Sequence, residues 1–236
     1  MFRFKQFNID QTKAPFKVGT DGILLGAWCD TNNASKCLDI GTGSGIIALM
    51  LAQRTQNEIH AVEINETAYL QAKQNIEMSP WNKNINITNT SFQTFCNNFN
   101  KDKFDLIVSN PPYFINSLKS NNQAKNTARH TDTLSHKDIL VRSKNIINPA
   151  GKLCVVLPEE EGMSYINTAI ENEWHLTKLT KVFPNPNKPV KRLLIETSLT
   201  KHPLAEDSIT IETGLKRHDY TQEYMALTRA FYIIFD

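Results

Sequence analysis

Short apolar runs alternate with longer amphipathic stretches through most of this 236-residue chain, and that alternation restricts the fold more than any other feature. Each run has the length of a buried strand, and each stretch is long enough for a helix that crosses from one strand to the next. This order of elements predicts a parallel sheet with helices on both faces. We expect strands at 37–40, 59–64, 85–88, 104–109 and 153–157, and helices near 46–55, 66–78, 92–99, 136–147 and 160–172.

The last third of the chain adds two strand candidates, 176–183 and 193–199. The proline-rich segment between them, 184–189, is too short to hold a crossover helix, so these two strands should pair antiparallel. The sequence therefore predicts an α/β, Rossmann-like fold. Its sheet should be seven-stranded and mostly parallel, with a terminal antiparallel hairpin.

Shorter sequence patterns near the two ends of the chain also predict secondary structure. Residues 2–9 are typical of an extended segment, a turn is expected around Pro15, and a helix should start near Thr20. Thr221 can cap a last helix, on which Tyr224, Leu227 and Phe231 would form one apolar stripe that we expect to join the core. We expect a single domain over residues 1–236, with residues 1–34 as an N-terminal strand and helix extension.

The composition is that of a globular chain with a sizeable core, since 40% of its residues are hydrophobic and 21% are charged. The longest apolar run around the first helix, 46–52, is far shorter than the roughly 18 residues typical of a membrane span. The first residues lack the apolar block of a signal peptide. We therefore expect a cytoplasmic protein that does not contact membranes.

The four cysteines, Cys29, Cys37, Cys96 and Cys154, are widely spaced and have no histidine nearby at ligand spacing. Neither a zinc site nor a disulfide framework is indicated, and we expect no bound metal. Small buried thiols are the favoured interpretation.

Basic residues are unevenly placed in this chain, although its formal net charge is only +2. They outnumber acidic residues at 115–145 and at 178–192, and two local patches of this kind suit a polyanion. Arg129, Lys188, Lys191 and Arg192 are the candidates for contacts with RNA phosphates. Solvated lysines on ordinary faces remain the other interpretation.

A glycine-rich loop, Gly41, Gly43 and Gly45, follows the first strand of the alternating region and precedes a helix. A dinucleotide-binding fingerprint would need its third glycine one position later, where this chain has Ile46, so a nicotinamide cofactor is disfavoured. The glycines let a ligand approach the backbone, and Asp39 before them could reach the ammonium of a methionine moiety, directly or through water. A tight turn between strand and helix is the alternative.

Two further residues favour S-adenosylmethionine as the ligand of this loop. Glu63 ends the next strand, where a carboxylate can accept both hydroxyl hydrogens of a ribose. Ser91 follows the third strand, where a side chain could contact the adenine amino group. The spacing of the loop, Glu63 and Ser91 fits consecutive βαβ units.

The motif Asn110-Pro111-Pro112-Tyr113 stands at the end of the fourth apolar run. An aromatic amine is a poor nucleophile because its lone pair is delocalised into the ring. The Asn110 side-chain oxygen and the Pro111 carbonyl could each accept one N–H of such an amine, while the two prolines hold the backbone and Tyr113 offers a stacking face. Together with the glycine loop, the motif predicts methyl transfer to an exocyclic nitrogen. A plain proline turn after a strand is the alternative.

With these motifs the chain resembles the bacterial tRNA1(Val) adenine-N6 methyltransferases, which modify the adenosine immediately 3′ of the anticodon. The resemblance extends through nearly the whole chain, and its most specific parts are residues 17–28 and 109–114. It is also carried by 38–45, 48–54, 61–64, 71–75, 79–81, 128–131, 155–158 and 224–232.

The resemblance implies a class I methyltransferase fold, S-adenosylmethionine as cofactor and tRNA1(Val) as substrate. It also implies that Thr20, Asp21 and Gly22 lie beside the methionine end of the cofactor. The chain departs from the family at Ser91, where an aspartate is usual, and this puts the adenine contact in question.

Three other functions fit parts of the pattern. Enzymes that methylate the glutamine amide of release factors also carry Asn-Pro-Pro-Tyr, but they have a separate helical domain before the glycine loop, which this chain reaches at residue 41. Guanine-N2 methyltransferases of ribosomal RNA are commonly longer. A cofactor-binding RNA chaperone without turnover is the third, and it would bind S-adenosylmethionine without methylating any RNA.

Overall fold

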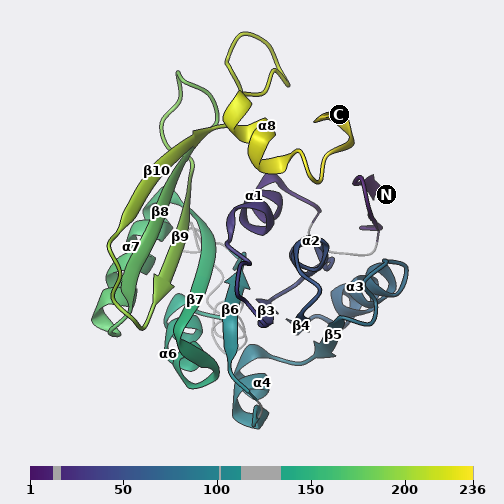
Figure 1. The fold of residues 1–236 in the computed structure, drawn as a ribbon, viewed down its shortest axis with the longest axis vertical. Helices are drawn as coiled ribbons and strands as arrows, with labels where there is room; N and C mark the ends of the chain where they lie inside the picture. Colours follow the sequence, from purple (N-terminus) through teal and green to yellow (C-terminus); the bar gives the residue numbers. More distant parts are fainter. Residues whose placement is uncertain (13–16, 101, 113–133, 236) are drawn as a thin grey trace, which may run out of the picture.

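A computed structural model of the chain describes residues 1–12, 17–100, 102–112 and 134–235 (Figure 1). Within these residues one large sheet has the strand order β10-β8-β9-β7-β6-β3-β4-β5. Strands β5, β4, β3, β6 and β7 pair in parallel, and β9 pairs antiparallel with both β7 and β8. The strands are β3 (Lys36–Ile40), β4 (Glu58–Glu63), β5 (Ile85–Asn89), β6 (Phe104–Ser109), β7 (Ile147–Pro158), β8 (His175–Phe183), β9 (Arg192–Ser198) and β10 (Ala205–Thr210).

Helices cover both faces of this sheet (Figure 1). Successive side chains of a strand point to opposite faces of the sheet, so they enter two separate hydrophobic clusters, one on each face. The first cluster includes side chains of α1, α2, α3 and α8, and the second those of α4, α6 and α7. The helices are α1 (Thr20–Trp28), α2 (Ile46–Arg54), α3 (Glu66–Glu77), α4 (Phe92–Asn98), α6 (His136–Ile146), α7 (Glu159–Glu171) and α8 (Gln222–Thr228), and a 3-10 turn, η2 (Ile233–Phe235), follows.

The predicted fold class is confirmed, and the expected helices and strands are found, most of them within one or two residues of the predicted bounds. Strand β7 is the exception, because it begins at Ile147 instead of near residue 153. Thr221 caps α8 through a hydrogen bond from Tyr224 N (3.2 Å), and Tyr224 and Phe231 are buried as expected.

The predicted number of strands was wrong, because the sheet has an eighth strand. β10 pairs in parallel with β8 at the sheet edge, from Ala205 opposite Lys178 to Thr210 opposite Phe183. None of its six residues is buried, and its sequence, Ala-Glu-Asp-Ser-Ile-Thr, has no alternation of apolar and polar residues. An exposed edge strand of this composition gives no periodic signal in the sequence.

The N-terminal segment is fastened to the rest of the chain by hydrogen bonds. Its short strands β1 (Phe2–Arg3) and β2 (Asn8–Ile9) form an antiparallel pair. Asp10 N donates to Asn75 Oδ1 (2.9 Å), and Asn75 Nδ2 donates to Asp10 O and to Ser44 O (2.8 Å each). The buried Asn75 of α3 therefore holds the N-terminal segment against the glycine loop. Pro15 lies outside the described residues.

The neighbouring strands β6, β3 and β4 place the predicted site residues together. All three run in the same direction, so Ser109, Ile40 and Glu63 end at one edge of the sheet. In open α/β sheets, ligands bind in the crevice outside the carboxyl ends of the strands. None of the helices that the structure describes is long and apolar enough to span a bilayer.

Candidate cofactor and catalytic site

The glycine loop exposes its backbone at Gly41 and packs tightly at Gly45. Gly41, Gly43 and Gly45 have φ values of 68°, 59° and 84°, in the left-handed region that glycine tolerates best. A β-carbon at Gly41 would meet no atom within 4 Å, whereas one at Gly45 would lie 3.5 Å from Ala72 Cβ. The first glycine therefore leaves space for a ligand, and the third lets α3 approach the loop.

Asp39 lies beneath this loop and is fully buried. Its Oδ2 accepts hydrogen bonds from Thr42 Oγ1 (2.6 Å) and Ala48 N (3.1 Å), which join the loop to the start of α2. Its buried Oδ1 has no hydrogen-bond partner among the residues the structure describes. Burial raises the pKa of this carboxyl from 3.8 to about 7. A cationic ligand group that reached Oδ1 would satisfy that oxygen and favour the ionised form.

Glu63 contributes a second, nearly buried carboxylate at the end of β4. Its Oε2 accepts a hydrogen bond from Gly43 N (2.9 Å) and its Oε1 one from Asn65 N (2.8 Å). These two backbone contacts were not foreseen from the sequence. Each carboxylate oxygen can accept a further hydrogen bond, so Glu63 can fix the loop and still receive two hydroxyl groups.

Beyond the end of β5, Ser91 is the N-cap of α4. Its Oγ accepts a hydrogen bond from Thr94 N (3.0 Å) and also contacts Thr94 Oγ1 (2.9 Å). The adenine contact expected for Ser91 stays a prediction. Asn89, which sequence reasoning missed because no motif marks it, donates to the backbone carbonyl of Glu63 (2.8 Å).

Asn110 and Pro111 follow β6 directly. Asn110 is half-buried, Pro111 is buried and Pro112 is exposed, whereas Tyr113 lies outside the described residues. Gly22, near the start of α1, packs beside them: a β-carbon there would lie 4.0 Å from Asn110 Nδ2 and 3.5 Å from Ile46 Cγ2. The start of α1 therefore contacts both the predicted catalytic amide and the helix that follows the glycine loop.

An ion pair fastens the start of α1 to β9. Arg192 Nε lies 2.8 Å from Asp21 Oδ2, both side chains are about one-fifth exposed, and Arg192 Nη1 donates to Lys191 O (2.8 Å). Arg192 was expected to contact RNA phosphate, which stays a prediction; the structure shows that its side chain pairs with Asp21, in the segment expected to lie beside the cofactor. Thr20, Lys188 and Lys191 are exposed, and Arg129 lies outside the described residues.

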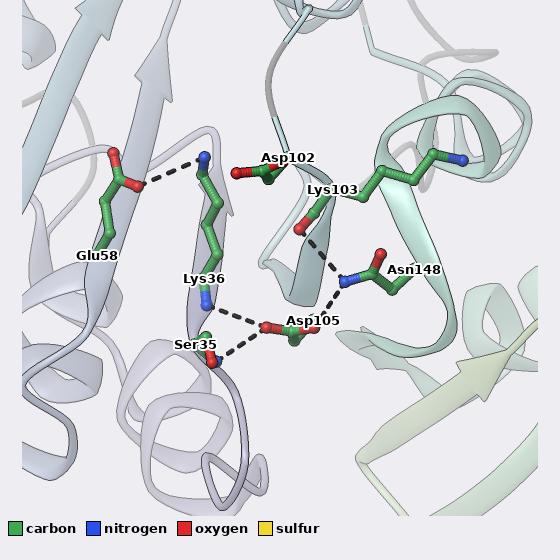
Figure 2. Close-up of a pocket in the computed structure, with 7 residues that line it drawn as sticks. All are labelled: Ser35, Lys36, Glu58, Asp102, Lys103, Asp105 and Asn148. Carbon is green, nitrogen blue, oxygen red and sulfur yellow. Dashed lines mark hydrogen bonds and ion pairs between the residues drawn. The ribbon is translucent and has the colours of Figure 1, made fainter.

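A polar pocket of about 400 Å³ lies at the opposite edge of the sheet, where β3, β4 and β6 begin, and Figure 2 shows the residues that line it. Its central carboxylate, Asp105, accepts hydrogen bonds from the backbone amides of Ser35 (2.8 Å) and Lys36 (3.1 Å) and from Asn148 Nδ2 (2.7 Å). Lys36 Nζ lies 3.4 Å from Glu58. These contacts join strand starts on the side away from Gly41 and Asn110, so we assign the pocket no part in the reaction.

The four cysteines are at least half-buried, and the residue types that bind metals form no cluster among the described residues. Cys29, Cys37 and Cys154 are buried and Cys96 is half-buried, and burial raises the pKa of all four thiols. Over the described ranges, no three His, Cys, Asp or Glu side chains are grouped closely enough to hold a metal ion.

Some known proteins are similar to this chain in sequence, and others are similar in fold. The methyltransferase small domain matches residues 17–182. The tRNA1(Val) (adenine(37)-N6)-methyltransferase of Parabacteroides distasonis is 45% identical and that of Bacteroides fragilis 42%; each match covers 98% of this chain and 97% of the relative. A predicted O-methyltransferase from Agrobacterium tumefaciens superposes with a TM-score of 0.68 at 15% identity, over 89% of this chain and 96% of the other. The chain belongs to the methyltransferase small domain family and, within it, to the tRNA1(Val) (adenine(37)-N6)-methyltransferases.

Proposed function

We propose that this protein transfers a methyl group from S-adenosylmethionine to N6 of adenosine 37 in tRNA1(Val). The observation that carries the proposal is the position of Asn110 and Pro111, at the carboxyl end of β6 and next to the strand that leads into the glycine loop. The relatives that match nearly the full length of the chain carry this activity in their names. A tRNA substrate also implies that the enzyme acts in the cytoplasm.

The residues around the glycine loop fit S-adenosylmethionine, which supplies an electrophilic methyl group when bound. The unpartnered Asp39 Oδ1 and the open backbone at Gly41 suit the methionine end. Glu63 retains the acceptor capacity that a ribose diol requires. The remaining cofactor contacts that we propose are Thr20, Asp21, Gly22, Gly43, Gly45, Ser91 and Asn110.

The catalytic task of this chain is to make the adenine amino nitrogen more tetrahedral, so that its lone pair is no longer delocalised into the ring and can attack the methyl group. Asn110 Oδ1 and the Pro111 carbonyl accept the two N–H groups, and Pro111 and Pro112 hold that stretch of backbone by their fixed φ angles. Tyr113 provides the stacking face. No strong base is needed, because the amine becomes acidic only once it carries the new methyl group. A base inside a helix cannot reach these groups, so the adenosine is presented from a loop or flipped out.

The tRNA contacts proposed are Arg129, Lys188, Lys191 and Arg192. Lys188 and Lys191 are exposed next to the start of β9, where phosphates can approach them. Arg192 already forms an ion pair with Asp21, so its phosphate contact should be weaker than that of the two lysines.

We also propose that residues 1–236 form one domain that includes the extension 1–34. Trp28 Nε1 donates to Thr180 Oγ1 of β8 (2.8 Å), and Asn75 holds Asp10, so both ends of the extension are bonded to distant parts of the chain. Removing the extension should therefore expose the core instead of trimming an independent unit.

Single-turnover methylation of an unmodified tRNA1(Val) transcript tests this function, with N6-methyladenosine at position 37 as the scored product. Asn110→Ala should still bind S-adenosylmethionine, because the loops before Asn110 hold most of the cofactor, and it should react on the order of a hundredfold more slowly, because one oriented acceptor is lost. Asn82→Ala, on an exposed turn, is the matched control and should react normally. Near-normal turnover by Asn110→Ala, or methylation of a release-factor glutamine instead of RNA, would contradict the proposal.

A further inference from the structure

Two loops meet beyond the ends of β8 and β10. The first, residues 184–191, connects β8 to β9, and the second, residues 211–221, connects β10 to α8. Ile211 N donates to Phe183 O (2.9 Å) and Glu212 N to Pro184 O (3.0 Å). A β-carbon at Gly214 would lie 3.5 Å from Pro186 Cδ. The two loops therefore lie in contact, and Figure 1 shows both at the upper end of the view.

These loops lie at the same edge of the sheet as the predicted site. Arg192, the first residue of β9, pairs with Pro158, the last residue of β7, so the first loop lies at the carboxyl end of β7. β10 runs parallel to β8, which places the second loop at this edge as well. Arg192 also reaches Asp21, next to the glycine that packs beside Asn110.

The second loop is held in shape by its own hydrogen bonds. Glu212 and Tyr220 form an antiparallel bridge, and Thr213 N donates to Asp219 O (2.7 Å). Both carboxylates of the loop are engaged inside it, since Glu212 Oε1 accepts from His218 N (3.1 Å) and the Asp219 carboxylate accepts from the Thr213 hydroxyl. The loop has as many acids as Lys and Arg residues, but the acids are half-buried and the cations are at its exposed tip.

The two tips together present four exposed cations and one exposed apolar side chain. The cations are Lys188 and Lys191 in the first loop and Lys216 and Arg217 in the second. Within the described residues none of the four forms an ion pair with a carboxylate. Leu215 stands beside them and is 87% exposed, more than any other large hydrophobic residue described.

We propose that the two loop tips form one RNA-binding surface, the two-loop surface, which consists of Lys188, Lys191, Leu215, Lys216 and Arg217. This surface binds the tRNA backbone away from the target adenosine. The inference rests on the proposed function and adds Leu215, Lys216 and Arg217 to the substrate contacts. When cations without acidic partners neutralise phosphates, the counterions condensed on the RNA are released, and this favours binding. The internally bonded loop is already ordered, so binding need not order it. Leu215 offers its apolar surface to a ribose or an unstacked base.

Binding of an unmodified tRNA1(Val) transcript at a series of KCl concentrations tests the two-loop surface. The double variant Lys216→Ala/Arg217→Ala should lower the slope of log affinity against log salt by about two and weaken binding at least roughly tenfold at 0.1 M salt. Leu215→Ser should weaken binding with the wild-type slope, since it removes no charge. Lys83→Ala/Lys103→Ala removes the same charge from exposed positions near the amino edge of the sheet and should leave the slope unchanged.

A second double variant, Lys188→Ala/Lys191→Ala, tests whether both loops bind the same RNA molecule. If they do, combining the two pairs should lower the slope by about four. The control variant Lys83→Ala/Lys103→Ala should methylate at the wild-type rate, whereas the variants of the two-loop surface should need more tRNA to reach half of their maximal rate, because the surface binds substrate away from the reacting amine. Wild-type slope and affinity in Lys216→Ala/Arg217→Ala, with normal methylation by the wild type, would overturn this inference alone. Failure of the wild-type enzyme to methylate any tRNA would instead overturn the proposed function.

Discussion

Removing the carboxylate of Glu63 should destabilise the glycine loop and weaken cofactor binding together. The carboxylate accepts hydrogen bonds from Gly43 N and Asn65 N in a position only 8% exposed. Each hydrogen bond to a charged acceptor contributes about 1.5 to 3 kcal/mol. Because water can reach the half-buried Gly43 amide after truncation, the lower end applies, and Glu63→Ala should lower the unfolding free energy by about 3 kcal/mol. Loss of the proposed ribose contacts should weaken S-adenosylmethionine binding by about a further 1 to 3 kcal/mol, roughly 5- to 150-fold in Kd.

Urea unfolding and titration calorimetry measure these two effects separately. Glu63→Gln keeps one acceptor oxygen, so its losses should fall between those of the wild type and Glu63→Ala. Glu77→Ala removes an exposed carboxylate at the other end of the neighbouring helix and should change neither quantity. Reduced stability with unchanged cofactor affinity would leave Glu63 a purely structural role. If the free energy of unfolding were also unchanged, the two backbone hydrogen bonds of Glu63 would not stabilise the loop, and the reasoning would be refuted.

Four more outcomes are expected for residues at the same edge of the sheet. Because burial raises the Asp39 pKa from 3.8 to about 7, this group should make the unfolding free energy fall as pH rises from about 4 to 7, and Asp39→Asn should remove that dependence in pH-dependent unfolding. Below pH 7, S-adenosylmethionine binding should release a proton in the wild type but not in Asp39→Asn, measurable by calorimetry in two buffers of different ionisation enthalpy. Ser91→Asp should keep the α4 cap and tighten S-adenosylmethionine binding; an unchanged Kd would show that this position does not contact adenine. Arg192→Ala should weaken S-adenosylmethionine binding more than Lys191→Ala does, since the Arg192 side chain forms an ion pair with Asp21.

The sequence predicted the buried part of the fold well and the exposed part poorly. Strands such as β3 and β6 are almost wholly buried because helices cover both of their faces, so most of their residues are apolar and the sequence marks them clearly. β10 is polar because one edge and much of its surface face water, and nothing in its residues distinguishes it from a loop. Its pairing with β8 depends on a partner that lies more than 20 residues earlier in the chain.

The positions of the site residues were predictable, but their contacts were not. Gly41, Glu63 and Asn110 each follow or end a strand, and the order of those strands in a parallel sheet brings them to one edge. The contact of Arg192 with Asp21 joins residues 171 positions apart, and no local pattern encodes such a distance. From the sequence, Arg192 was therefore interpreted only as a phosphate contact, because its neighbours in the chain are basic.

The Arg192–Asp21 pair links the segment proposed to lie beside the cofactor to the surface proposed for RNA. Lys191 is the adjacent residue, and its carbonyl accepts the second hydrogen bond of the Arg192 guanidinium. A phosphate that moved Lys191 would therefore act on the group that holds the start of α1, where Gly22 packs beside Asn110. If tRNA and S-adenosylmethionine bind cooperatively, this pair is the physical connection through which either ligand would favour the other, and reciprocity requires equal factors in both directions. Arg192→Lys keeps the charge but cannot make both contacts with the planar geometry of a guanidinium, so it should reduce that coupling while leaving the phosphate attraction intact. Measuring the Kd of S-adenosylmethionine with and without tRNA in the wild type and in Arg192→Lys gives the coupling directly, and equal ratios in the two proteins would exclude this route.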